Sequence, residues 1–159
     1  MGLASGVTRV CWGTDGPLFI GVTNRGWGSR GQGTYGLQRV RWNGATPFEL
    51  REMRAVAGGF ELEFTLPVEE TSAVDPASYR MSSYTYELHE EYGSAKMDER
   101  PLALTSVARI DATHVRLAVD GLRSGYVHEL HLPGIRAASG AALLHERAYY
   151  TLVEMPPAR

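Results

Sequence analysis

The sequence predicts an all-β protein whose larger part is an antiparallel sandwich. Three observations predict this fold class. Short runs rich in β-branched and aromatic residues recur along the 159 residues. Turn pairs such as Asp15-Gly16 and Asn43-Gly44 separate these runs. Helical periodicity is almost absent, and many short strands with turns between them are typical of a sandwich.

Three strands are expected in the first part of the chain. Residues 7–12 are rich in β formers, residues 17–22 form a nearly continuous apolar run, and residues 37–42 alternate apolar and polar side chains. A glycine-rich stretch, residues 24–36, lies between the second and third runs and predicts a surface loop.

The clearest strand of the sequence follows Gly58-Gly59. Phe60, Leu62, Phe64 and Leu66 fall on one face, and charged or polar residues fall on the other, which predicts a half-buried antiparallel strand. Further strands are expected over residues 79–86, 107–110, 115–119, 126–132 and 148–153. Loops are expected over residues 68–76 and 89–101, and the only candidates for short helical turns are residues 51–57 and 141–147.

Composition excludes several classes of function. The net charge of -2 and the pI near 6.2 argue against binding nucleic acid through bulk charge. Cys11 is the only cysteine, so an intramolecular disulfide and a cysteine zinc site are both excluded. We expect no membrane span, because no apolar stretch reaches about 18 residues, and no signal peptide, because the N-terminus lacks a basic start and an apolar segment.

One loop carries candidate ligand-binding residues. Residues 26–31 match the spacing GxGxxG, but a strand follows them where a dinucleotide site needs a helix. Within and beside this motif, Asn24, Arg25, Trp27 and Arg30 are the predicted ligand-binding residues, since an aromatic ring between guanidinium groups can stack on a sugar or hold an anion. The alternative is that the tryptophan packs beneath its own loop.

Two other clusters invite a metal interpretation that the spacing does not support. His128 and His131 are three apart on an expected strand, so their rings point to opposite faces and cannot hold one ion. Five acidic residues surround the expected loop over residues 89–101 without the register of a calcium loop: Glu87, Glu90, Glu91, Asp98 and Glu99. We therefore predict no catalytic residue and no metal ligand.

Several segments resemble a known family. Residues 15–31 and 36–42 resemble the last propeller blade of glucose/sorbosone dehydrogenase-like, PQQ-type propeller proteins, which are often fused to c-type cytochrome modules. The later segments resemble the domain appended to that blade, and the second half also resembles bacterial immunoglobulin-like domains. The segments that carry this second resemblance include residues 46–49, 59–68, 75–79, 84–86, 92–94, 128–134 and 148–152.

The resemblance implies a partial β-propeller blade over residues 1–45 and an immunoglobulin-like β-sandwich over residues 46–156. It also implies a C-terminal fragment of an exported protein, periplasmic or extracellular. Three strands cannot build a propeller, and the chain has no haem motif. No cofactor is therefore expected in this chain, whereas PQQ and haem c are expected in a full-length parent. The implied partners are the rest of the propeller or a cytochrome module, and carbohydrate.

Three functions follow. The first is a non-catalytic structural or interaction module, with Trp27, Tyr84, Tyr86 and Tyr92 as contact residues. The second is a part of a PQQ-dependent sugar or alcohol dehydrogenase, in which residues 24–31 line the propeller mouth. The third is an autonomous carbohydrate-binding β-sandwich. The substrate and the oligomeric state are not set by the sequence.

Overall fold

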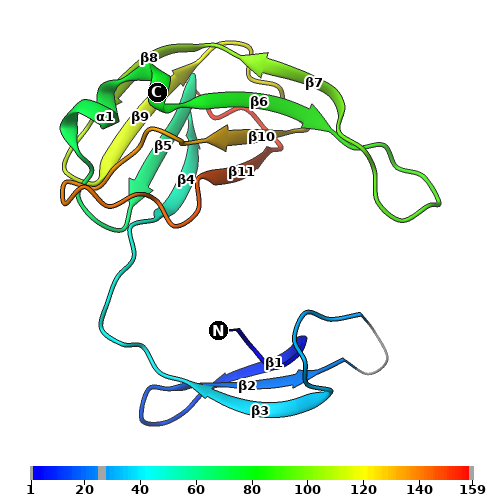
Figure 1. Ribbon diagram of the computed structural model, residues 1–159. Coiled ribbons are helices and arrows are strands. Elements are labelled where there is room, and N and C mark those ends of the chain that lie inside the picture. The colour runs from blue at the N-terminus through cyan, green and yellow to red at the C-terminus, as the bar shows by residue number, and fades with distance from the viewer. Residues whose placement is uncertain (1, 25–27, 158–159) are drawn as a thin grey trace. The chain divides into compact units, whose positions relative to one another are not determined.

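The computed structural model describes residues 2–24 and 28–157, and the all-β prediction is confirmed there (Figure 1). Every regular element of this part of the chain is a strand, apart from two short helical segments. In chain order the elements are β1 (Val7–Trp12), β2 (Leu18–Thr23), β3 (Tyr35–Val40), β4 (Leu50–Val56), β5 (Gly59–Phe64), α1 (Glu70–Val74), η1 (Pro76–Ser78), β6 (Arg80–Thr85), β7 (Met97–Leu102), β8 (Leu104–Arg109), β9 (His114–Val119), β10 (Tyr126–His131) and β11 (Arg147–Leu152).

The chain divides into two compact units, Met1–Ala45 and Thr46–Arg159. The first unit holds one three-stranded sheet in the order β1-β2-β3. The second holds two four-stranded sheets, in the orders β4-β5-β9-β8 and β11-β10-β6-β7. Among the residues described, no helix is long and apolar enough to cross a membrane.

The N-terminal sheet is an antiparallel meander, and the residues that precede β1 form hydrogen bonds with it. Ile20 in the central strand lies opposite Val10 and Gln38, and it is buried. The amide of Ala4 donates to Gln38 Oε1 at 2.7 Å, and the carbonyl of Ala4 accepts from the amide of Gly33 at 2.7 Å. Residues 2–6 are thereby fixed across one part of the sheet.

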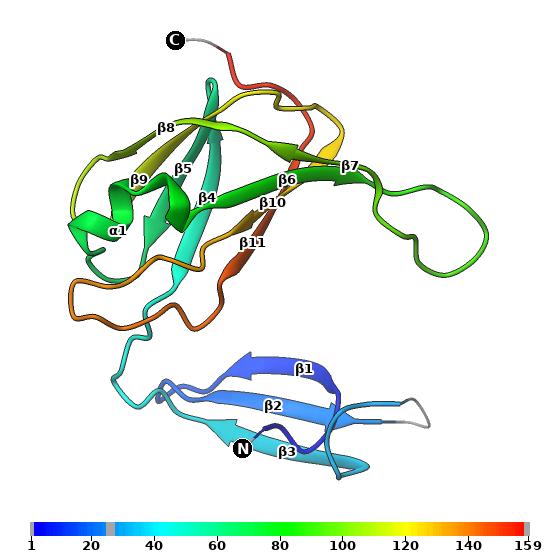
Figure 2. The ribbon, with the colours of Figure 1, turned by 45° about the horizontal axis from the view of Figure 1, so that its top comes forward.

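The second unit is a two-layer sandwich with one core (Figure 2). Phe60, Leu62 and Phe64 of β5 are buried, as their period-2 spacing predicts. The ring of Phe60 lies 5.6 Å from that of His128 and 5.5 Å from that of Tyr150, both in the opposite sheet. Burying side chains of this size contributes about 1.5–3 kcal/mol each, so the contacts between the sheets hold the two layers together.

The prediction of a plain loop over residues 68–76 is wrong. This segment contains α1 and the start of η1. The carboxylate of Asp75 accepts from the amide of Ala77 at 2.9 Å and caps η1. The hydroxyl of Tyr79 donates to the carbonyl of Ala73 at 2.7 Å, so a buried tyrosine ties α1 to the start of β6.

Neither of the two candidate helical turns forms a helix, and one expected loop is shorter than predicted. Residues 51–57 are not helical: they lie in and just after β4, where Met53 pairs with Leu62 of β5. Tertiary pairing overrides the local helical spacing here. Residues 141–146 form irregular chain, and β11 begins at Arg147. The expected loop over residues 89–101 ends early, because β7 begins at Met97.

The chain enters and leaves the sandwich at opposite ends of β4. Phe48, just before β4, is buried and accepts a hydrogen bond from the amide of Leu144 at 3.1 Å. Pro156 and Pro157, just after β11, line one surface hollow together with Ala57 at the far end of β4.

Candidate functional site

The predicted ligand-binding loop has a structural explanation for its glycines. Gly31 has a φ of 117°, and a Cβ there would lie 2.4 Å from the carbonyl oxygen of Ala4. Asn24 is half-buried, and its amide donates to the carbonyl of Thr34 at 2.9 Å. The loop leads directly into β3, so the helix that a dinucleotide site needs is absent from the residues described after the loop.

The structure describes two of the four predicted ligand-binding residues, Asn24 and Arg30. Asn24 is held by the backbone contact just described, and Arg30 is exposed. Arg25 and Trp27 lie outside the described residues. The ligand-binding prediction for these four residues therefore stays a prediction.

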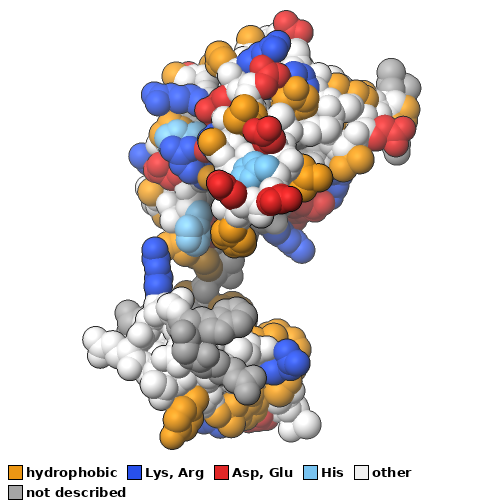
Figure 3. All heavy atoms as spheres, turned by 90° about the vertical axis from the view of Figure 1, so that its right-hand side faces the viewer, with side chains coloured by type: hydrophobic (Ala, Val, Ile, Leu, Met, Phe, Trp, Pro, Cys, Tyr) orange, Lys and Arg blue, Asp and Glu red, His pale blue; other side chains and the backbone are white. Residues whose placement is uncertain are grey.

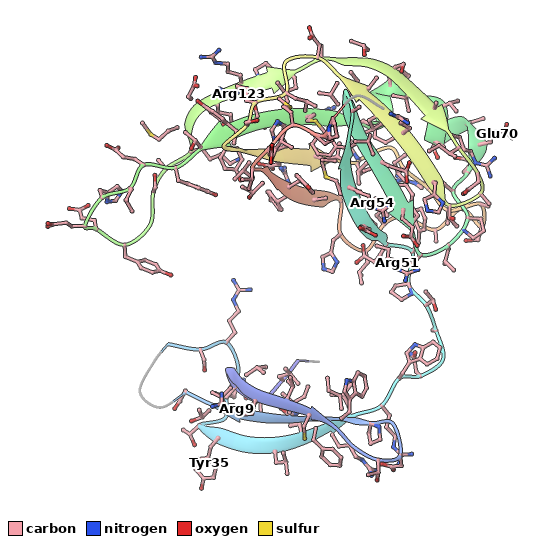
Figure 4. The ribbon with its side chains drawn as sticks, turned by 180° about the vertical axis from the view of Figure 1, so that it is seen from behind. Arg9, Tyr35, Arg51, Arg54, Glu70 and Arg123 are labelled. Carbon is pink, nitrogen blue, oxygen red and sulfur yellow. The ribbon has the colours of Figure 1, made fainter. Side chains whose placement is uncertain are left out.

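The N-terminal sheet carries apolar side chains on both faces. On one face Val10, Trp12 and Val40 are 58%, 76% and 43% exposed. Leu37 and Tyr35 lie on the other face and are 74% and 81% exposed. Residues paired across antiparallel strands share a face, which assigns these sides from the register. Tyr35 points away from the sheet (Figure 4), and apolar side chains stand on the surface of this unit (Figure 3).

Both edges of this sheet are also unpaired in the described part of the chain, since β1 and β3 pair only with β2. An unpaired strand presents a row of N–H and C=O groups that can accept another strand. A contiguous patch of exposed apolar side chains usually marks a site of interaction. This sheet is therefore the first candidate surface.

The outer face of the sheet β11-β10-β6-β7 carries a charge network that local sequence reasoning missed. Glu129 is only 6% exposed and forms ion pairs with Lys96 and Arg147. Burial alone would raise the pKa of Glu129, but the hydrogen bonds from these two cations outweigh burial and hold it below its ordinary value. Lys96 also lies 4.4 Å from the ring centre of Tyr84.

The two histidines of β10 lie on opposite faces of the sheet. His128 is fully buried, and its Nδ1 lies 3.2 Å from the carbonyl oxygen of Tyr126. Burial lowers the pKa of His128. His131 faces outward, where its Nε2 lies 3.4 Å from a carboxylate oxygen of Glu146. The buried ring is thus a packed, hydrogen-bonded part of the core.

The five acidic residues considered for calcium are dispersed. Asp98 accepts hydrogen bonds from Arg100, Arg123 and Tyr126. Glu99 pairs with Lys96. The remaining three, Glu87, Glu90 and Glu91, lie exposed in the loop between β6 and β7. Among the residues described, no group of three or more His, Cys, Asp and Glu could hold a metal ion.

The predicted tyrosine contacts differ in exposure. Tyr84 is buried, and burial raises its pKa to about 12. Tyr86 is 53% exposed, and its ring stands edge-on to Tyr84 with centres 5.4 Å apart. Tyr92 is fully exposed in the loop between β6 and β7. Only the last two are accessible to a partner.

Comparison with known proteins shows that the chain resembles some solved structures in fold alone. No protein-family model matches the chain, and no curated protein matches it. Two matching solved structures are of S-layer proteins: one of rSbsC(31-844), at 16% identity, and one of SbsC domains 1–6, at 17% identity. Both have a TM-score of 0.50 and cover 67% of this chain. The chain spans 14% of the length of each.

The expected membership of the glucose/sorbosone dehydrogenase-like, PQQ-type propeller family is wrong. The structures that match are S-layer proteins, and nothing found links the chain to a PQQ dehydrogenase. The predictions of PQQ and haem c in a longer parent rested on this resemblance, which no longer supports them. The same is true of the predicted cytochrome partner.

Proposed function

We propose that the chain is a non-catalytic structural and interaction module of an exported, extracellular protein. In this proposal the sandwich is a rigid scaffold and the N-terminal sheet is the contact surface for a protein partner. The observation that carries it is the exposure of large apolar side chains on both faces of that sheet, Trp12 on one and Leu37 on the other.

The strand order supports an immunoglobulin-like assignment for the sandwich. If β4 to β11 are labelled A, B, C, C′, D, E, F and G, the sheets read A-B-E-D and G-F-C-C′. Immunoglobulin domains of the constant type have sheets ABED and CFG, so the proposed fold adds one strand to that pattern. Tyr126 begins strand F two residues before the inward-facing His128, as the tyrosine of a tyrosine corner does, although its hydroxyl bonds to Asp98.

A partial propeller blade remains our proposed description of the N-terminal sheet. Propeller blades are four-stranded antiparallel sheets stacked against their neighbours. A meander of three strands with apolar groups on both faces fits such a sheet with one strand lacking. The proposed extracellular location is consistent with the S-layer proteins whose fold the chain resembles.

Hydrogen exchange of the full chain tests the proposed contact surface. The chain is compared alone and mixed with an envelope fraction from the cells that encode it. We expect exchange to slow in peptides from β1, β2 and β3 and to stay unchanged in the sandwich. Leu37→Glu should abolish this protection, and Gln32→Glu, at an exposed loop residue, should retain it. Protection confined to the sandwich, or none at all, would contradict the proposal.

A carbohydrate-binding sandwich is the second candidate, and one observation favours it. Tyr149 is 56% exposed and lines a surface hollow together with His131 and Arg147. An exposed aromatic ring beside hydrogen-bond donors can stack on a sugar. Calorimetry of the full chain with cell-wall polysaccharide tests this, with binding expected to be lost in Tyr149→Ala. An absence of heat with every polysaccharide rules this candidate out.

A further inference from the structure

The two units of the chain carry opposite net charge. The first 45 residues contain five arginines and a single acidic residue, Asp15. The remaining residues contain eleven Lys and Arg against seventeen Asp and Glu. A chain with a net charge of -2 is therefore strongly polarised along its length, with a basic sheet followed by an acidic sandwich.

One face of the N-terminal sheet combines apolar and cationic groups. We call it the basic face; it consists of Arg9, Phe19, Leu37 and Arg39. Phe19 lies opposite Arg39, and Gly21 lies opposite both Arg9 and Leu37, so all four side chains project to the same side. Neither Arg9 nor Arg39 has a carboxylate within 4.0 Å among the residues described. The Arg9 guanidinium donates only to the carbonyl of Thr8.

The sandwich carries a complementary element. We call residues 86–92 the acidic loop; it projects from the end of β6 away from both sheets (Figures 1 and 2). Leu88 and Tyr92 are fully exposed. Glu87, Glu90 and Glu91 stand beside them, and none of the three has an ion-pair partner within the described chain. The amide of Glu87 donates to Ser94 Oγ at 3.0 Å, which gives the loop a defined base.

We infer that the acidic loop of one copy docks on the basic face of a second copy of this chain. This inference rests on the proposed function and names the partner of that surface. Leu88 and Tyr92 would cover Phe19 and Leu37, and the loop carboxylates would meet two guanidinium groups that otherwise lack an acidic partner. Every copy carries both halves of this contact, so each copy can bind one neighbour through its acidic loop and another through its basic face.

A contact between two different surfaces of the same chain is heterologous, and such contacts extend into a ring or an open filament. The expected product is a closed ring or a series of growing oligomers, and the smallest ring is a dimer in which each loop docks on the sheet of the other copy. Arginine–carboxylate pairs at an exposed interface weaken as salt rises. Association should therefore decrease between low ionic strength and about 1 M salt, where charges are screened beyond about 3 Å.

Light scattering and sedimentation of the full chain over a range of concentrations test the inference. We expect the mean mass to rise with concentration above that of the monomer. The triple reversal Glu87→Lys, Glu90→Lys, Glu91→Lys should weaken association by at least about tenfold, because like charges then face each other. Arg9→Glu with Arg39→Glu should do the same. Glu154→Lys changes an exposed carboxylate outside the contact and should leave association unchanged.

Mixing the two charge-reversed proteins is the decisive step. Each should stay monomeric alone, and the equimolar mixture should associate, because the lysine loop of one matches the glutamate face of the other. A wild-type chain that stays monomeric at every concentration overturns the inference, including the case in which its own loop covers its own sheet. The inference is also overturned if both charge-reversed variants, each alone, associate as strongly as the wild-type chain.

The failure of this inference is distinguishable from the failure of the proposed function. If exchange of β1–β3 slows only with the envelope fraction and never with rising concentration of the chain itself, the sheet has a different partner and the second-copy inference alone is wrong. If neither condition slows exchange, both are wrong.

Discussion

The guanidinium of Arg123 donates hydrogen bonds to both the side chain and the main chain of Asp98. Arg123 Nη1 donates to Asp98 Oδ2 at 2.6 Å, and Arg123 Nη2 donates to the Asp98 carbonyl at 2.9 Å. Asp98 has a φ of 48°, the only positive φ outside glycine among the residues described. Such a conformation persists only where its surroundings stabilise it. The guanidinium also donates to Ser83, and so fastens the edge strand β7 to β6.

Replacing Arg123 should destabilise the sandwich. Arg123→Ala removes these hydrogen bonds and leaves a partly buried site without its donor, so the free energy of unfolding should fall by about 2 kcal/mol. Urea denaturation measures this. Arg100→Ala removes one exposed pair with the same aspartate and should cost less than about 1 kcal/mol. Equal losses in the two variants would show that the Arg123 contacts are not what stabilises β7.

The buried His128 should make stability depend on pH below neutrality. Burial lowers its pKa below the ordinary value of 6.5, so the unfolded chain binds a proton that the folded chain does not. Stability should therefore fall as the pH drops below about 6.5, by up to about 1.4 kcal/mol per pH unit. His128→Leu should flatten this slope in denaturation curves collected from pH 7 to 5. His89→Gln, in the exposed loop, should leave it unchanged.

Glu129 should contribute a separate acid-sensitive component. Its pKa is held below the ordinary value of 4.5, so its ion pairs stabilise the fold above that pH. The contribution is lost as the pH falls through the lowered pKa. Glu129→Gln should remove this loss from unfolding measurements between pH 5 and 2, with exposed Glu154→Gln as the matched control. A profile identical to wild type would contradict the role of Lys96 and Arg147.

The N-terminal unit should depend on Gly31. Alanine there is strained by the φ of 117° and would bring Cβ to 2.4 Å from the Ala4 carbonyl oxygen. That carbonyl accepts from the amide of Gly33, so Gly31→Ala should speed exchange of the Gly33 amide by at least about tenfold. Gly28→Ala has nothing within 4 Å of the added carbon and should leave exchange unchanged. Equal exchange in both variants would show that residues 2–6 do not depend on this approach.

Within the sandwich, the strand that the sequence predicted most clearly is one with a buried face. Phe60, Leu62 and Phe64 alternate with charged residues, and their strand was evident from that spacing. β7 was missed because residues 98–101 are Asp, Glu, Arg and Pro, which are typical of a charged edge strand and give no apolar period. Hydrophobic spacing therefore does not locate a strand such as β7, in which no face is apolar.

The candidate surfaces were harder to predict. The partners of Glu129 lie 33 and 18 residues away in the sequence, so no local pattern reveals the network. The glycines of residues 24–36 suggested a ligand, whereas Gly31 is needed for the close approach of Ala4. The mistaken family resemblance has a related cause. Short glycine and aromatic motifs describe a small sheet well, but they do not specify what covers it.

The opposite placement of the two ends of the sandwich has a mechanical consequence. A pull between Phe48 and Pro156 runs along β4 and β11. The six residue pairs between β10 and β11 would then be loaded together in shear, as would the rungs between β4 and β5. The residue pairs between strands loaded in this way do not separate one after another. A string of such sandwiches would transmit tension along its length and would yield at a rate set by the unfolding barrier.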